Sequence, residues 1–128
     1  MTKNITVIGS SNTDMVVKTS AFPKPGETVI GGEFLMHAGG KGANQAVAAA
    51  RFGGIVSFVT KIGKDLFGSN AVNSLKHNNV DIKYILQDDK RASGVALITV
   101  NENGENQIVV APGANGVLTI SDIDSSSS

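Results

Sequence analysis

A glycine-rich segment that leads into a run of small residues is the part of the sequence best suited to chemistry. It runs from Ala38 to Gly53 and reads AGGKGANQAVAAARFG. Two glycines at a helix entrance let the backbone approach a ligand closely, and the unpaired amides of the first turn point outward. Lys41 and Asn44 follow on the same side of the helix. The segment suits a polar, oxygen-rich ligand, although a glycine-rich helix cap with an exposed lysine explains the same residues.

This segment fails two common phosphate-binding patterns. In the Walker A pattern, Leu35 stands where the first glycine belongs, and Gly42 follows Lys41 where Ser or Thr should bind magnesium. In the dinucleotide-binding pattern, Gln45 occupies the third glycine position. The sequence therefore argues against a nucleotide-phosphate loop at this helix.

Two polar side chains lie near the N-terminus. Asn12 and Asp14 follow a short apolar run, residues 5–10, that predicts a buried strand, and function often sits where such a strand ends. From the residues alone, the commoner role of an aspartate beside an asparagine is to stabilise a turn.

Neither histidine has the surroundings of a catalytic base. His77 falls in the last turn of a predicted helix, where a contact with the helix dipole explains it. His37 precedes the glycine pair without a positioned nucleophile or an orienting carboxylate. Charged residues 88–91 are typical of a solvated loop, and no carboxylates have metal-site spacing. We therefore assign no catalytic residue and no metal ligand.

The elements that would position these residues alternate along the chain. Four apolar runs predict strands over residues 5–10, 27–36, 55–62 and 82–86. The second run has a bend or bulge at Gly31 and Gly32. Helical spacing predicts helices over 41–52 and 65–78, and residues 93–115 predict a β-hairpin around the turn NENGEN. This order indicates an α/β fold.

Composition limits the class of protein. A chain of 128 residues is long enough for one domain with a core, and 11 basic against 11 acidic residues leave no charge footprint for nucleic acid or a membrane surface. The sequence shows no secretory signal, no bilayer-spanning run and no cysteine. We expect a cytoplasmic protein. Residues 122–128, which end in four serines, predict a flexible tail or the start of a helix.

Four stretches together resemble a known family. GGKGANQAVAAARFGG, at residues 39–54, resembles the first signature of the ribokinase-like (PfkB) carbohydrate kinases, and its ribokinase branch more than its fructokinase branch. GSSNTDMV, FPKPGET and SGVALITVNENGENQIVVAPGAN agree, in the expected order. The resemblance covers nearly the whole chain but less than half of a full family member.

The resemblance implies a mostly parallel sheet flanked by helices, with a small β lid near residues 14–38 and 93–111, here as an incomplete N-terminal fragment. It also implies a sugar site with polar contacts from Asn12, Asp14 and the glycine-rich segment, under an apolar cover from the hairpin. The implied substrate-binding residues are Asn12, Asp14, Gly39, Gly40, Lys41, Asn44, Ala96, Ile98 and Val110.

The implied activity is that of an ATP-dependent kinase that converts D-ribose and ATP to D-ribose 5-phosphate and ADP. The family's GAGD-type motif, which bears the catalytic base, does not occur in the sequence, so we expect that base beyond Ser128 and the 128 residues alone to be inactive. ATP, Mg²⁺ and a monovalent cation (K⁺) are implied for the full-length enzyme and none within this fragment. The implied partners are a pentose and a second copy bound through the lid. A stand-alone sugar-binding or regulatory module, or a kinase of a related sugar such as 2-deoxyribose, are the alternatives.

Overall fold

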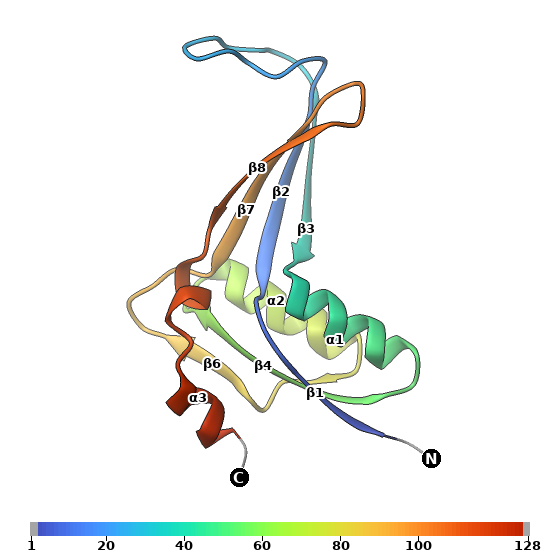
Figure 1. The fold of residues 1–128 in the computed structure, drawn as a ribbon, viewed down its shortest axis with the longest axis vertical. Coiled ribbons are helices and arrows are strands. Elements are labelled where there is room, and N and C mark those ends of the chain that lie inside the picture. Colours follow the sequence, from blue (N-terminus) through green and yellow to red (C-terminus); the bar gives the residue numbers. More distant parts are fainter. Residues whose placement is uncertain (1–2, 127–128) are drawn as a thin grey trace.

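The computed structural model describes residues 3–126, which form an α/β core and a β-sheet that stands away from it (Figure 1). The strands are β1 (Asn4–Ile8), β2 (Asn12–Lys18), β3 (Glu33–Gly39), β4 (Ile55–Gly63), β5 (Val80–Asp81), β6 (Ile85–Asp88), β7 (Gly94–Val100) and β8 (Asn106–Ala111). The helices are α1 (Lys41–Arg51), α2 (Leu66–His77), the 3₁₀ turn η1 (Gly113–Val117) and α3 (Ile120–Ser125). Across this described part of the chain, every helix is too short or too polar to cross a membrane.

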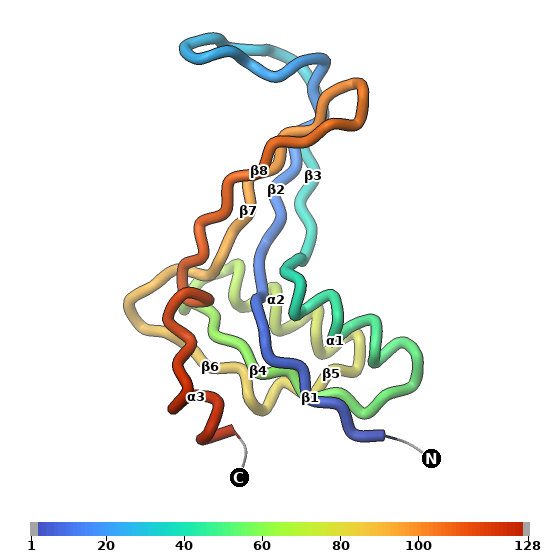
Figure 2. The backbone as a smooth tube through the Cα atoms, in the orientation of Figure 1, coloured from blue at the N-terminus to red at the C-terminus, as the bar shows by residue number. Residues whose placement is uncertain are grey.

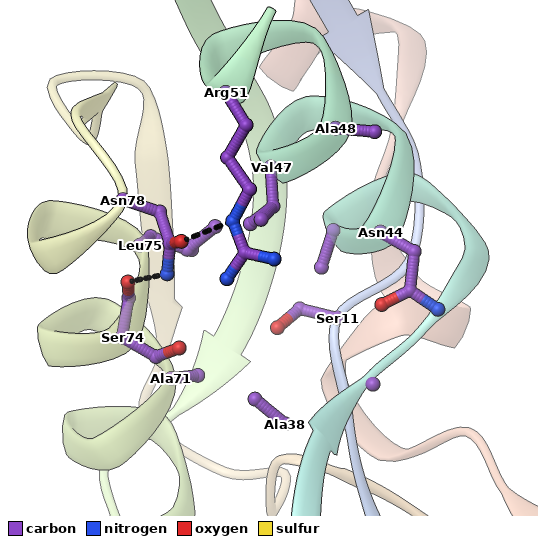
Figure 3. A pocket seen from close by; sticks show the side chains of 12 residues that line it. Ser11, Ala38, Asn44, Val47, Ala48, Arg51, Ala71, Ser74, Leu75 and Asn78 are labelled. Carbon is purple, nitrogen blue, oxygen red and sulfur yellow. Dashed lines mark hydrogen bonds between the residues drawn. The ribbon is translucent and has the colours of Figure 1, made fainter.

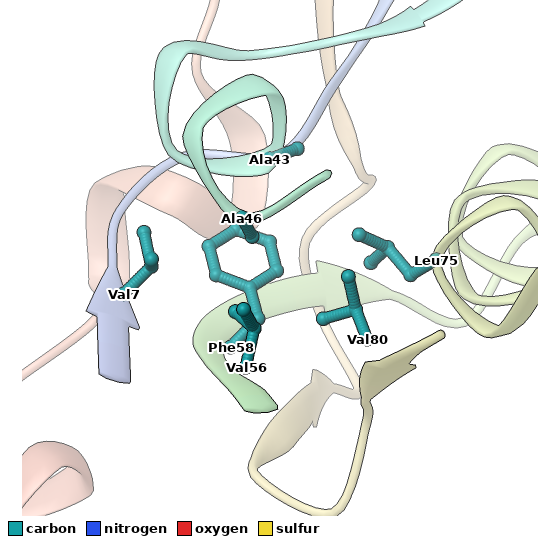
Figure 4. Packing of buried hydrophobic residues seen from close by; sticks show 7 residues of the cluster. All are labelled: Val7, Ala43, Ala46, Val56, Phe58, Leu75 and Val80. Atoms are coloured by element: carbon teal, nitrogen blue, oxygen red, sulfur yellow. The ribbon is translucent and has the colours of Figure 1, made fainter. Parts of the chain in front are cut away.

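The core sheet is parallel and carries α1 and α2 on one face. Its order is β1-β4-β5, and β6 pairs in parallel with the second half of β4. Val7 of β1 lies opposite Phe58 of β4, and both are buried against the helices. Ala43 and Ala46 face them from α1, and these small side chains bring the helix close to the sheet (Figure 4).

The second sheet has the order β3-β2-β7-β8 and rises from the core as one layer (Figure 2). β2 and β7 run parallel, whereas β3 and β8 run antiparallel to their neighbours. Only residues 9–11 separate β1 in the core sheet from β2 in the second sheet. The junction between the two sheets therefore lies beside the start of α1.

Close backbone contacts at this junction require glycine. A Cβ on Gly42 would lie 2.8 Å from the Cα of Gly9. Gly40, the N-cap of α1, has φ 96°, and a Cβ there would lie 2.6 Å from the carbonyl oxygen of Ser10. The Ala43 amide donates a hydrogen bond of 3.0 Å to that carbonyl. These contacts fix the first turn of α1 against the chain that enters β2.

The C-terminal segment is held to the core sheet by an ion pair. Lys61 of β4 donates to Asp122 of α3 at 2.8 Å and to the Val117 carbonyl at 3.2 Å. Asp122 also completes a capping box with Thr119. Of the tail predicted at residues 122–128, residues 122–125 lie in α3, while Ser127 and Ser128 lie outside the described residues.

The predicted α/β fold is confirmed, but two predicted strands were wrong and one strand was missed. The strand predicted over 27–36 begins only at Glu33, because Gly31 and Gly32 have φ values of 106° and 118° that break the extended chain. The strand predicted over 82–86 is replaced by β5 and β6, with a turn between them. β2 was not predicted, since Asn12 and Asp14 have low strand propensity.

Candidate functional site

The predicted site residues of the second sheet share one face of it. Asp14 of β2 lies opposite Ala96 of β7, which in turn lies opposite Val110 of β8. Directly opposed residues project to the same side of a sheet, and so do residues two apart on one strand. Asn12, Asp14, Ala96, Ile98 and Val110 therefore form one surface, which we call the Asp14 face.

The carboxylate of Asp14 is seated on the backbone of Gly39. A Cβ at position 39 would lie 2.2 Å from Oδ2 of Asp14 and 2.5 Å from Oδ1, so only glycine leaves room for this side chain. Asp14 is half-buried and makes no hydrogen bond or ion pair with any residue from 3 to 126. A partly desolvated carboxylate without a partner is a ready acceptor for a ligand.

Asn12 lies at the base of the same face. It is opposite Gly39 on one side and Gly94 on the other. Its Oδ1 accepts a hydrogen bond of 2.8 Å from Nδ2 of Asn115, which follows the hairpin in η1. The structure thus brings Asn12, Asp14 and Gly39 together at the junction between the two sheets.

The remaining predicted residues begin α1. Gly40 abuts Asn12, because a Cβ on Gly40 would lie 2.9 Å from the Asn12 amide nitrogen. Lys41 is the first residue of α1, and its ammonium forms no bond to any of residues 3–126. Asn44 lies one turn further along α1. The contacts of Gly40 join it to the Asp14 face, whereas Lys41 is placed only by its position in α1 and Asn44 lines a neighbouring cavity.

A cavity of about 330 Å³ lies between α1 and α2, next to this site. Asn44 and Ser74 line opposite sides of it, and Arg51 donates to Asn78 at 2.9 Å across its rim (Figure 3). Neither Asn12 nor Asp14 lines this cavity. It is therefore separate from the Asp14 face, although Gly39 and Asn44 border it.

Sequence reasoning missed the residues that anchor the hairpin. Asp65 caps α2 by accepting from the Gly68 amide at 2.8 Å, and it accepts from the amide and hydroxyl of Ser93 at 2.8 and 2.7 Å. Burial opposes its ionisation, but these hydrogen bonds outweigh burial and hold the pKa of Asp65 below its ordinary value. Asn115 was missed as well, since 103 residues separate it from Asn12. The sequence around it, Gly113-Ala114-Asn115, indicates a turn but does not reveal the partner.

The described residues contain no ligand set for a metal ion. Among residues 3–126, no three His, Cys, Asp or Glu side chains are grouped closely enough to hold one. A hard cation such as Mg²⁺ requires several oxygen ligands in a near-octahedral arrangement. These residues therefore offer no cluster of such side chains from which a protein-made metal site could be built.

Comparison with known proteins identifies the family. The model of the pfkB family of carbohydrate kinases matches residues 2–127. The chain belongs to this family. The ribokinase of Bacillus subtilis is 49% identical over 117 residues, 91% of this chain, and the deoxyribokinase of Salmonella typhi is 42% identical over 121 residues, 94% of this chain. The chain spans 40% of the length of each of these relatives.

A solved structure of another protein has the same arrangement of helices and strands as this pfkB-family chain. The structure of Arabidopsis thaliana ribokinase complexed with ribose and ATP matches 97% of the chain with a TM-score of 0.81 and 30% identity, and the match covers 42% of that protein. The predicted ribokinase-like α/β fold, represented by a part of the full structure, is therefore confirmed.

Proposed function

We propose that this chain is the sugar-binding part of an ATP-dependent ribokinase. The observation that carries the proposal is the half-buried, unpartnered carboxylate of Asp14 on the Gly39 backbone. Family membership and the relatives named as ribokinases support D-ribose as the substrate. The complete protein would transfer the γ-phosphoryl group of ATP to the 5-hydroxyl of the sugar.

The proposed site binds the sugar through its hydroxyls. Asp14 accepts hydrogen bonds from two neighbouring hydroxyls, and the carboxylate is a strong acceptor because it is charged and partly desolvated. Asn12 supplies a neutral amide beside it. Lys41, Asn44 and the backbone at Gly39 and Gly40 supply further donors at the first turn of α1.

We propose that the second sheet acts as a lid over this site. Ala96, Ile98 and Val110 are three of the apolar residues on this side of the sheet, and Ala96 is buried while Val110 is 51% exposed. A bound sugar would give these side chains cover, and they would exclude water from the reacting hydroxyl. The proposed lid segments near residues 14–38 and 93–111 include β7, β8 and most of β2 and β3.

ATP, Mg²⁺ and K⁺ are proposed for the complete protein only. Bound Mg²⁺ supplies charge that stabilises the phosphates during transfer. Because residues 3–126 hold no ligand set for it, we derive no catalytic step through this ion. The contribution of the described residues is to bind and orient the sugar.

A kinase of 2-deoxyribose is the second candidate. The observation that favours it is the similar identity of the Salmonella typhi deoxyribokinase. Ribose and 2-deoxyribose differ by one hydroxyl, and a site that hydrogen-bonds that hydroxyl discriminates strongly against the sugar without it. Titration of the complete protein with both pentoses decides between the two.

Asp14→Ala tests the proposed site. Loss of a charged acceptor costs about 1.5–3 kcal/mol, so we expect ribose affinity to fall roughly tenfold to a hundredfold. The unfolding midpoint should change little, since Asp14 has no partner among residues 3–126. Asp89→Ala, which removes an exposed carboxylate that pairs with Lys64, is the control. Wild-type ribose affinity in a folded Asp14→Ala protein would return Asp14 to a structural role.

We also propose that the complete protein dimerises through its lid. The side of the second sheet opposite the Asp14 face, which we call the Leu97 face, carries exposed apolar side chains from all four strands. These are Val17, Phe34, Met36, Leu97 and Val109. An apolar surface of this kind is typical of an interaction site, and a second copy of the same sheet would present a matching apolar surface.

A further inference from the structure

The side-chain amide of Asn115 has its orientation fixed by backbone groups. Its Oδ1 accepts from the Ser11 amide at 2.9 Å, and its Nδ2 donates to the Ser11 carbonyl at 3.0 Å. A backbone N–H only donates and a backbone carbonyl only accepts. Rotating the Asn115 amide by half a turn would therefore break both bonds, and Nδ2 is the atom that faces Asn12.

The orientation of Asn12 follows from that of Asn115. Nδ2 of Asn115 donates a second hydrogen bond, of 2.8 Å, to Oδ1 of Asn12. If the Asn12 amide were reversed, two NH₂ groups would oppose each other. Nδ2 of Asn12 consequently points away from Asn115, and it donates to no residue between 3 and 126.

The absence of a side chain at Gly94 provides the space that this amide pair occupies. A Cβ at position 94 would lie 2.2 Å from Nδ2 of Asn115 and 2.4 Å from Oδ1 of Asn12. The two amides thus pack directly over the Gly94 backbone at the start of β7. Asn115 connects the end of the hairpin to the start of β2 through these contacts.

We propose that Asn115 is a positioning residue that presents the Asn12 amide to the sugar as a hydrogen-bond donor. The inference rests on the proposed function, because it takes Asn12 and Asp14 as sugar ligands. A hydroxyl has one proton. A hydroxyl that donates its one hydrogen bond to Asp14 can only accept a hydrogen bond from Asn12, so the donor end of the Asn12 amide must face it. Asn115 selects that end.

Asn115→Asp tests the proposal with little change of shape. The aspartate keeps an oxygen that accepts from the Ser11 amide, but it replaces the donor Nδ2 with an acceptor that repels Oδ1 of Asn12 and the Ser11 carbonyl. We expect ribose affinity, measured calorimetrically on the complete protein without ATP, to fall roughly tenfold. Asn103→Asp, which makes the same charge change in the hairpin turn, should bind ribose as wild type does.

A double-mutant cycle separates positioning from a general structural role. In an Asn12→Ala background there is no amide to orient, so Asn115→Asp should weaken ribose binding no further. An equal loss in both backgrounds would overturn the proposal. If Asn12→Ala itself binds ribose as wild type does, the assignment of Asn12 in the proposed function fails, and it fails independently of Asn115.

Asn12→Asp keeps the test decisive if Asn115→Asp does not fold. The carboxylate that this substitution introduces still accepts from Nδ2 of Asn115, so the unfolding midpoint should stay near wild type. The sugar then meets an acceptor in place of a donor, and we expect a loss of ribose affinity of about tenfold or more. Unchanged affinity in this variant would show that a donor at this position is not required, which overturns the proposal.

Discussion

The carboxylate of Asp14 occupies the space that any side chain at position 39 would need. The two residues belong to neighbouring strands, yet they are not directly opposed, because Asp14 pairs with His37 and Gly39 pairs with Asn12. The Asp14 side chain therefore leans along β3 towards the start of α1. This contact connects the acceptor in β2 with the donors of the glycine-rich segment.

Gly39→Ala should weaken sugar binding without removing any polar group. The added Cβ would lie 2.2 Å from Oδ2 of Asp14, so the carboxylate must move. We expect ribose affinity of the complete protein to fall roughly tenfold or more, as a displaced charged acceptor loses most of its hydrogen-bond energy. Calorimetric titration measures the loss. Gly116→Ala is the control, because its Cβ would meet Pro112 at an ordinary 3.7 Å; equal affinities in the two variants would contradict the prediction.

The sequence predicted the regular elements better than the contacts between them. α1, β4, α2 and the hairpin were predicted within a few residues, since each has a clear apolar period and a turn signal at its ends. The resemblance also assigned the Asp14 face. Whether its residues bind a sugar stays a prediction.

Long-range polar contacts could not be predicted from local patterns. Asn115 contacts Ser11 and also Asn12, which lies 103 residues earlier in the sequence. Asp65 contacts Ser93, which lies 28 residues later. Asn and Asp occur commonly in turns and caps, so their letters do not reveal such partners. β2 was missed because Asn12 and Asp14, near its start, have low strand propensity.

Leu97→Glu should separate a lid-mediated dimer. Leu97 is 52% exposed at the centre of the Leu97 face, and a charge there would be desolvated in an apolar interface. We expect the complete wild-type protein to sediment as a dimer at micromolar concentration and the variant as a monomer. Phe52→Glu is the control, since Phe52 is equally apolar and 94% exposed but follows α1, away from the lid. A monomeric wild-type protein would refute the lid dimer.

The ion pair of Asp122 should make stability depend on pH in a narrow acidic range. The hydrogen bond from Lys61, followed by those from Thr119, lowers the pKa of Asp122 from 3.8 to about 2. Because the folded-state pKa is below the unfolded value, the unfolded chain takes up the proton at higher pH. The stabilisation is therefore fully present above pH 3.8 and is lost as the pH falls to about 2.

Asp122→Asn measures this contribution. Asparagine can still cap α3 by accepting from the Thr119 amide, but it carries no charge to pair with Lys61. We expect the variant to have a lower unfolding midpoint than wild type at about pH 6, and the difference to shrink as the pH falls through the window above. Asp124→Asn, a nearby change in the same helix, should show no such trend. A difference that stays constant down to pH 2 would exclude the ion pair as its source.

Residues 1–128 alone should not phosphorylate ribose, even if they bind it. A general base has to lie within hydrogen-bond reach of the hydroxyl that it deprotonates. Asp14 already accepts from the sugar in the proposed site. His37 lies opposite Asp14, and His77 lies in the last turn of α2, but in the described residues neither imidazole is hydrogen-bonded to an orienting carboxylate.

The glycine-rich start of α1 is already used by the sugar in the proposed site. Within residues 3–126, no second glycine-rich helix start lies beside the Asp14 face to bind the ATP phosphates. Incubation of the purified 128-residue chain with ribose, ATP and Mg²⁺, followed by measurement of ribose 5-phosphate, provides the test, with the complete protein run in parallel. We expect product only from the complete protein. Comparable turnover by the 128 residues would place a base and a nucleotide site within them and overturn the division of labour proposed for this chain.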